Sequence, residues 1–185
     1  MKFLKLALAS TLTLSANVNA ALVNLDWQVS GDNLITHDTD SNLKWLDLTV
    51  TTGYSYSYVN SQLGSGGQFE GFQYATTGEV VTLWNNFNID LSQPSTSASA
   101  GFDQGLITAT NWLGNNLCES DCLTDPYGVA GITSTQASNN PAYHERIGSW
   151  YNPISDLTIY ATPMSQYVSE TAPYDWVGSY LIQTS

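Results

Sequence analysis

The chain has 185 residues, of which sixteen are Asp or Glu and only four are Lys or Arg, giving a net charge of −12. So acidic a chain cannot neutralise several phosphates, which excludes nucleic acid as a partner, and anionic membrane surfaces repel it. Aromatic residues make up 12% of the chain. They supply enough apolar area for a folded core, which excludes intrinsic disorder.

The first twenty residues predict a secretory signal peptide. Lys2 and Lys5 form a basic start, residues 6–14 are mostly apolar, and Ala20 closes a small-residue cleavage site. The apolar run is too short to cross a bilayer core of about 30 Å as a helix, and no later run reaches roughly 18 apolar residues. We expect a secreted protein, periplasmic or extracellular, with one domain over 21–185 and no membrane span.

The mature chain is expected to begin with a strand and a hairpin. Residues 21–29 partly alternate and contain β-formers, and Gly31-Asp32-Asn33 marks a turn. Two strand-like runs follow, over 34–37 and 43–48. The short polar side chains of 38–42 can hydrogen-bond the backbone of the turn between them, which predicts a hairpin.

Three helices are expected next. Residues 54–63 carry apolar side chains at helical spacing and end in glycines, and Thr76 with Glu79 has the capping-box pattern of a second helix start. Residues 92–100 are polar and indicate a loop. A third helix is expected over 102–113.

The second half of the chain is rich in turns and short β-like runs. These runs cover 127–132, 143–151, 157–161 and 176–182. Strands, then helices, then strands predict an α+β domain with a mainly antiparallel sheet and two or three packed helices, in which the two chain ends pair.

The segment 30–88 resembles a known family. Its motifs are Leu43-Lys44-Trp45, Gly66-Gly67 and Glu79-Val80, with a weaker similarity over 177–182. They are similar to exported bacterial proteins of the PEP-CTERM-associated type and, more distantly, to the C-terminal domain family of the Legionella collagen-like adhesin. The resemblance implies a C-type lectin-like fold, in which the N- and C-terminal strands pair and long loops carry binding.

Two departures limit what the resemblance implies. Gln73 stands where relatives commonly have Arg, and no sorting tail follows Ser185, so release is expected rather than surface anchoring. The adhesin relative is associated with sulfated glycans, and the acidity of this chain speaks against that ligand. Within the motif, strand and helix spacing places a set of apolar side chains in the core: Trp45, Leu46, Leu48, Tyr58, Phe72, Val80 and Leu83.

Calcium is a possible cofactor at two acidic places. Asp38 and Asp40 have the opening spacing of an EF-hand, but Leu43 and Thr49 stand where that loop needs Gly and Glu. A hairpin turn is the favoured interpretation, and an irregular calcium site is the alternative. The same choice, between a solvated loop and a calcium site, applies to the acidic group that includes Glu119 and Asp121.

Cys118 and Cys122 are the two cysteines of the chain. In an oxidising compartment they are expected to form a local disulfide that shapes this acidic loop. Their spacing has one residue too many for a thioredoxin-like motif. A zinc site would need two more ligands, for which His37 and His144 stand out.

No complete catalytic motif is present. The chain has no G-x-S-x-G, and His144-Glu145 lacks the second histidine of a metalloprotease helix. Sixteen acidic residues nevertheless leave room for the carboxylate pair of a polysaccharide hydrolase, which is one alternative function.

Aromatic residues close to asparagines give a second clue. Aromatic faces stack on the C–H surfaces of sugars while amides bond the hydroxyls, although each aromatic residue can instead belong to the core. The ligand-binding candidates are Trp112, Asn115, Tyr127, Trp150 and Tyr151, and Tyr143, Asn116, Asn139, Asn140 and Asn152 belong to the same mixture. The leading hypothesis is a secreted, non-enzymatic domain that binds neutral glycan or another matrix component. The alternatives are the hydrolase and an accessory domain for a protein partner.

Overall fold

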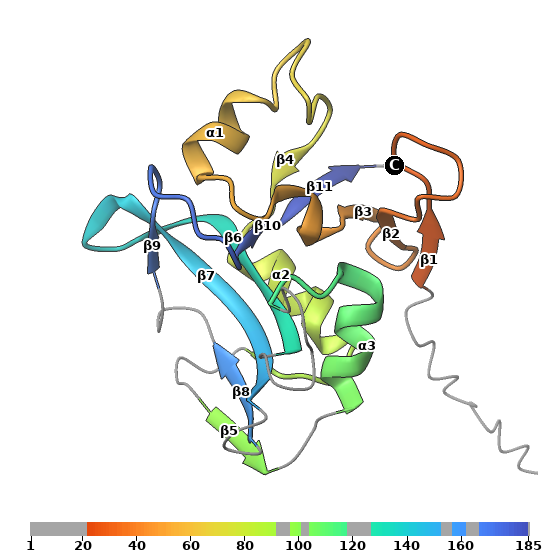
Figure 1. Cartoon of the computed structure of the whole chain (residues 1–185), viewed down its shortest axis with the longest axis vertical. Helices are drawn as coiled ribbons and strands as arrows, with labels where there is room; N and C mark the ends of the chain where they lie inside the picture. The colour runs from red at the N-terminus through yellow and green to blue at the C-terminus, as the bar shows by residue number, and fades with distance from the viewer. Residues whose placement is uncertain are drawn as a thin grey trace, which may run out of the picture.

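The computed structural model describes residues 22–91, 97–100, 104–117, 127–152, 157–161 and 167–184. They form two sheets, mainly antiparallel, with three α-helices, so the expected α+β class is confirmed (Figure 1). The proposed signal peptide lies outside the described residues. Within the ranges given above, no helix has the length and apolarity needed to cross a membrane.

The first sheet contains the predicted hairpin. Its order is β1-β2-β3-β11-β4, and every pairing is antiparallel. The strands are β1 (Leu22–Leu25), β2 (Ile35–Asp38), β3 (Leu43–Leu46), β4 (Gln73–Tyr74) and β11 (Leu181–Thr184). The expected pairing of the two end strands is wrong. In this sheet β1 pairs with β2 at one edge, whereas β11 lies between β3 and β4.

The second sheet is built around a long hairpin of β6 and β7. Its order is β10-β6-β7-β8-β5, with β9 paired to β7, and only the pairing of β10 with β6 is parallel. The strands are β5 (Ser97–Ala100), β6 (Tyr127–Ala137), β7 (Asn140–Asn152), β8 (Leu157–Ala161), β9 (Tyr167–Ser169) and β10 (Gly178–Ser179).

The helices pack on these sheets. A short 3-10 turn and three α-helices are present: η1 (Leu48–Thr51), α1 (Tyr56–Ser61), α2 (Thr77–Asn85) and α3 (Gln104–Leu113). The capping box is confirmed, since the Thr76 hydroxyl accepts the Glu79 N–H and the Glu79 carboxylate accepts the Thr76 N–H. Both α2 and α3 contact β6 and β7 on one face of the second sheet.

Alternation along the strands divides the apolar side chains between two buried clusters. Val129 of β6 and Ile147 of β7 belong to the cluster that includes the apolar faces of α2 and α3. Ile132 belongs to the other cluster, with Val59 of α1 and Phe69. The two faces of β6 and β7 are therefore different environments, which decides where polar and aromatic side chains on these strands end up.

The segment that ends in β11 joins the two sheets. Gly178 and Ser179 pair with β6, and two residues later the chain enters β11, which lies between β3 and β4 in the first sheet. Between them lies Tyr180, which is fully buried and bonds to both sides: its N–H donates to Ile132 O at 3.0 Å and its carbonyl accepts the Ala75 N–H at 2.8 Å.

Several details differ from the sequence-based expectations. Residues 97–100 form β5 rather than a loop, and β9 was not predicted. Both are short strands whose hydrogen bonds come from strands distant in the chain, β8 and β7, so local composition does not reveal them. Tyr58 was expected in the core but is 43% exposed, because it lies on the solvent face of α1. The other six residues expected there are buried.

Replacing Thr76 with Ala tests the capping box. The variant removes the acceptor for the Glu79 N–H and one partner of its carboxylate, so we expect a loss of about 1 kcal/mol in the free energy of unfolding, measured with urea. Thr82→Ala is the control, because that exposed hydroxyl only bonds back to the Gly78 carbonyl within α2. Equal losses in both variants would contradict the prediction.

Candidate functional site

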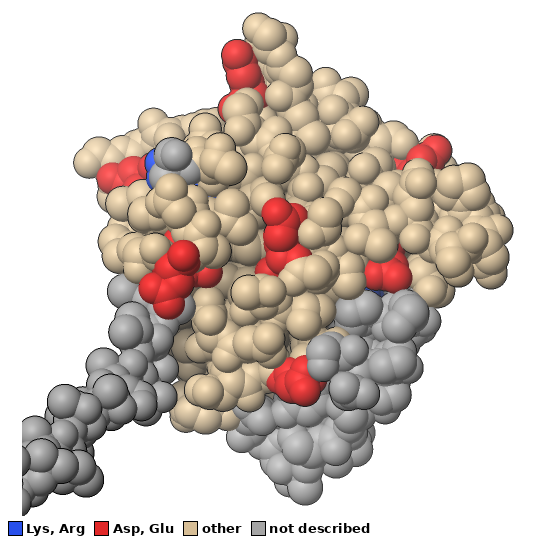
Figure 2. All heavy atoms as spheres, turned by 180° about the vertical axis from the view of Figure 1, so that it is seen from behind, with Lys and Arg blue, Asp and Glu red and all other residues tan. Residues whose placement is uncertain are grey.

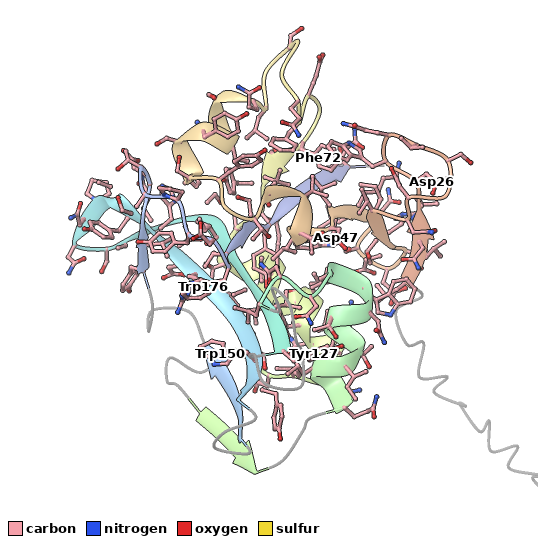
Figure 3. All side chains as sticks on the ribbon, viewed as in Figure 1. Asp26, Asp47, Phe72, Tyr127, Trp150 and Trp176 are labelled. Atoms are coloured by element: carbon pink, nitrogen blue, oxygen red, sulfur yellow. The ribbon has the colours of Figure 1, made fainter. Side chains whose placement is uncertain are left out.

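The structure separates the predicted ligand-binding residues. Tyr127 and Tyr151 face each other across β6 and β7 and pack against the cluster under α3, as does Trp112 from α3 itself. Trp150 neighbours Tyr151 on β7 and therefore points to the opposite face of the sheet. Figure 3 shows Trp150 and Trp176 beside β7, and Tyr127 toward α3. The five predicted residues do not share one surface.

The half-buried aromatic side chains on the α3 face have structural contacts. The Tyr127 hydroxyl hydrogen-bonds to the Thr110 hydroxyl of α3, and the backbone carbonyl of Trp112 accepts the Thr36 hydroxyl from β2. These bonds fix α3 between the two sheets. The rings of Trp112, Tyr127 and Tyr151 are partly buried against the core cluster, which leaves only part of each ring for contact with a ligand.

The side-chain amides of Asn115 and Asn116 hydrogen-bond to the backbone of β6, in the way that a neighbouring strand would. The Asn115 amide oxygen accepts the Gly128 N–H at 2.9 Å. Asn116 is buried and bonds both backbone groups of Ala130, accepting its N–H at 2.9 Å and donating to its carbonyl at 2.6 Å. A primary amide carries the same donor and acceptor as a peptide group, so these asparagines pair the part of the β6 edge that lies beyond β10.

The hairpin turn predicted at Asp38 is confirmed. Its buried carboxylate accepts the backbone N–H groups of Asp40 and Ser41, the Ser41 hydroxyl and the Asn86 amide, and Asn42 has a positive φ of 58°. Four donors occupy the acceptor sites that a calcium ion would use, so the carboxylate fits a turn better than a metal site.

The rest of the calcium hypothesis lies elsewhere. Glu119, Asp121 and the expected disulfide between Cys118 and Cys122 fall outside the described residues. Among residues that the structure does describe, no group of three or more His, Cys, Asp or Glu side chains is placed to hold a metal ion. Calcium therefore stays a prediction that depends on the acidic segment around the cysteines.

A pocket of about 310 Å³ lies between this hairpin and the start of α2, with Trp45 and Leu83 in its wall. Two carboxylates, Asp38 and Glu79, line it, which is the kind of pairing a hydrolase needs. Both are already engaged in local structure, however: Asp38 in its turn and Glu79 with the N–H and hydroxyl of Thr76, each at 2.7 Å.

A second, more open pocket lies at the closed end of the β6–β7 hairpin. It has a volume of about 380 Å³ and is lined by Ala137, Asn139, Asn140, Tyr143 and Tyr167. We call it the tyrosine–asparagine pocket. Tyr143 of β7 and Tyr167 of β9 are 40% and 39% exposed. In the register of β7 with β9, Tyr143 faces Ser169 and Glu145 faces Tyr167, so both rings stand on the same face of the sheet.

Glu145 lies opposite Tyr167 and two residues after Tyr143 on β7, and it connects the pocket to α2. Its buried carboxylate accepts the Thr77 hydroxyl at 2.6 Å, and the Thr77 N–H donates to the Thr135 hydroxyl of β6 at 3.0 Å. These two hydrogen bonds tie the strands that carry the pocket to α2 and restrain them before a ligand binds.

Sequence analysis found part of this pocket. Tyr143, Asn139 and Asn140 stand within five residues of one another and belonged to the predicted aromatic and amide mixture. Tyr167 was missed, because it reaches the pocket only through the pairing of β9 with β7. A short Tyr-Val-Ser strand carries no local signal that names its partner.

His144 lies on the other face of the same strand. It is 2% exposed and stacks on Tyr56 with the ring centroids 3.6 Å apart. The carbonyls of Thr133 and Ser134 lie nearby, but within the described structure neither ring nitrogen makes a hydrogen bond. Burial is the largest influence and lowers the pKa of His144 from its ordinary value. Burial therefore favours the neutral form of this ring, which is stacked on Tyr56.

Comparison of the chain with protein-family models, with curated proteins and with solved structures gives no match. The candidate site therefore rests on the geometry of the chain itself. The resemblance to exported PEP-CTERM-associated proteins stays a prediction.

Replacing Asn116 with Ala tests the amide that pairs with β6. Loss of the side chain leaves a buried N–H and a buried carbonyl of Ala130 without partners, so we expect about 2 kcal/mol less stability in urea unfolding. Asn60→Ala on the exposed face of α1 is the matched control and should change stability by less than about 0.5 kcal/mol. A small effect in both would show that the β6 edge finds other partners.

His144 predicts a stability that depends on pH. Because burial lowers its pKa in the folded state, the unfolded chain takes up the proton first as pH falls below its ordinary value of 6.5. The stability associated with the neutral ring is therefore present above pH 6.5 and is lost as pH falls toward the folded pKa. In His144→Phe the stacked ring remains but this loss should vanish, as measured by Tm at pH 5 and pH 8. If His37→Gln removes the acid sensitivity instead, the assignment is wrong.

Proposed function

We propose that this protein is a secreted binding domain that recognises neutral glycan through the tyrosine–asparagine pocket. The observation that carries the proposal is the pair of half-exposed rings, Tyr143 and Tyr167, on one face of adjacent strands beside the amides of Asn139 and Asn140. Rings on adjacent strands suit successive sugar units. The amides supply donors and acceptors for hydroxyl groups.

The lack of charge in the pocket supports a neutral ligand. None of its five lining residues is Asp, Glu, Lys, Arg or His. On the face shown in Figure 2, Asp and Glu side chains lie in separate places on a surface that is mostly uncharged. The protein as a whole carries an excess of negative charge, which repels polyanionic glycans but leaves neutral ones unaffected.

We also propose that the domain has a C-type lectin-like fold. In its favour, the first and last strands share one sheet, the sheets are mainly antiparallel and helices pack on them. Because β1 and β11 are separated by β2 and β3, the pairing of end strands that such a fold implies is missing. Secretion rests on the predicted signal peptide at residues 1–20.

The main test uses Tyr143→Ala and Tyr167→Ala. Each variant removes one stacking surface, so we expect retention on a neutral polysaccharide column or array to fall about tenfold or more, equivalent to about 1.4 kcal/mol. Both side chains are well exposed, so Tm should stay within a few degrees of the parent value. Tyr58→Ala is the matched control, because Tyr58 is similarly exposed but lies on α1.

The same screen separates the alternatives. Retention that is unchanged in both tyrosine variants would contradict the proposed pocket. Release of sugar products would favour the hydrolase and direct attention to Asp38 and Glu79. Retention that is lost with a chelator would support calcium in the segment of Glu119 and Asp121. No retention on any neutral glycan would favour the protein-partner alternative.

A further inference from the structure

We propose that Arg146, on the opposite face of the second sheet from the tyrosine–asparagine pocket, binds a single carboxylate group carried by a sugar, such as a terminal uronic acid. This site is independent of the neutral-glycan pocket. Arg146 is the only arginine in the chain, and it is placed by β7, in register with Ile132 of β6.

Two tryptophans surround the guanidinium. Its Cζ atom lies 4.5 Å from the centroid of the Trp176 ring and 6.0 Å from that of Trp150. Trp150 stands four residues further along the same face of β7, and Trp176 comes from the segment before β10. Aromatic faces stabilise a cation through the ring quadrupole, and this explains how a guanidinium is tolerated here.

The rings do not satisfy the hydrogen-bond donors. Arg146 is 9% exposed, and its Nε atom is buried with no acceptor among the described residues. Nor does the described part of the chain contain a carboxylate in ion-pair contact with this side chain, although the protein has an excess of acidic residues. Burial lowers the pKa of Arg146 to about 10, which still leaves the side chain charged at neutral pH. A buried guanidinium whose Nε–H has no acceptor lacks the anion that normally accompanies such a group.

The guanidinium of Arg146 and the ring of Trp176 together favour a carboxylate that is attached to a sugar. A planar guanidinium matches the two oxygens of a carboxylate. Trp176 is 36% exposed. Its ring can therefore stack on the sugar that carries the carboxylate. A polyuronate or an acidic protein segment would bring many negative charges toward a protein of charge −12, whereas a single carboxylate would not.

The tyrosine–asparagine pocket is separated from this site by the sheet itself. Tyr143 shares a face with Glu145, and Arg146 stands on the other face. The two sites can therefore be removed one at a time. Failure of one proposal leaves the other intact.

Because the chain has a single arginine, one resonance reports directly on the site. In protein labelled with ¹⁵N-arginine, the Nε–H signal of Arg146 is expected to move saturably on titration with sodium glucuronate and to stay in place with glucose at the same concentration. Sodium acetate, which has the carboxylate without the ring, should bind at least about tenfold more weakly.

Three variants complete the test. Trp176→Ala should weaken glucuronate about tenfold while the Arg146 signal stays resolved, which shows that the fold is retained. Lys44→Gln removes the other cation of the mature chain and should leave the affinity within about twofold. Tyr143→Ala should likewise leave it unchanged.

Three results with small solutes would overturn the proposal. They are an Nε–H signal that does not respond to glucuronate, an equal response to glucose, and a response to sodium chloride of the same size. A glutamate-rich peptide that moves the signal at lower concentration than glucuronate would also overturn it, in favour of an acidic protein partner.

Discussion

The fold depends on how the chain crosses from one sheet to the other at Tyr180. Its hydroxyl accepts the Trp84 indole N–H at 3.0 Å and donates to the Ile147 carbonyl at 3.3 Å, in a site with no exposure to solvent. Burial raises the pKa of this tyrosine well above its usual range. One residue thus ties α2, β7 and the backbone of both sheets together, and each buried polar group in it has a partner.

The two faces that this arrangement creates account for the positions of the two proposed binding sites. The face of β6 and β7 toward α2 and α3 is filled by core side chains for most of its length, and at the hairpin end it carries the half-exposed rings of Tyr143 and Tyr167. The opposite face holds His144 and Arg146 among aromatic rings. Alternation along a single strand, β7, therefore supplies a neutral site and a cationic one.

Local signals in the sequence were sufficient to predict the elements whose hydrogen bonds join residues close together in the chain. The hairpin at Asp38 and the cap at Thr76 are read from side chains that bond neighbouring backbone, and both are confirmed. Strands β5 and β9 and the position of β11 depend on partners distant in the chain, so composition did not reveal them. The same limit applied to the sites, since Tyr167 and Trp176 reach theirs only through tertiary pairing.

The place of β11 also has a consequence for the order of folding. Strand β11 is an interior strand of the first sheet, and it pairs with β3, more than 130 residues earlier in the chain. Such a sheet closes only after the final strand arrives, and closing so long a loop is slow. While β11 is absent, β3 and β4 each lack a neighbour, and the incomplete sheet has open edges that invite pairing with other chains. We therefore expect the chain to be most prone to aggregation while β11 is still unpaired.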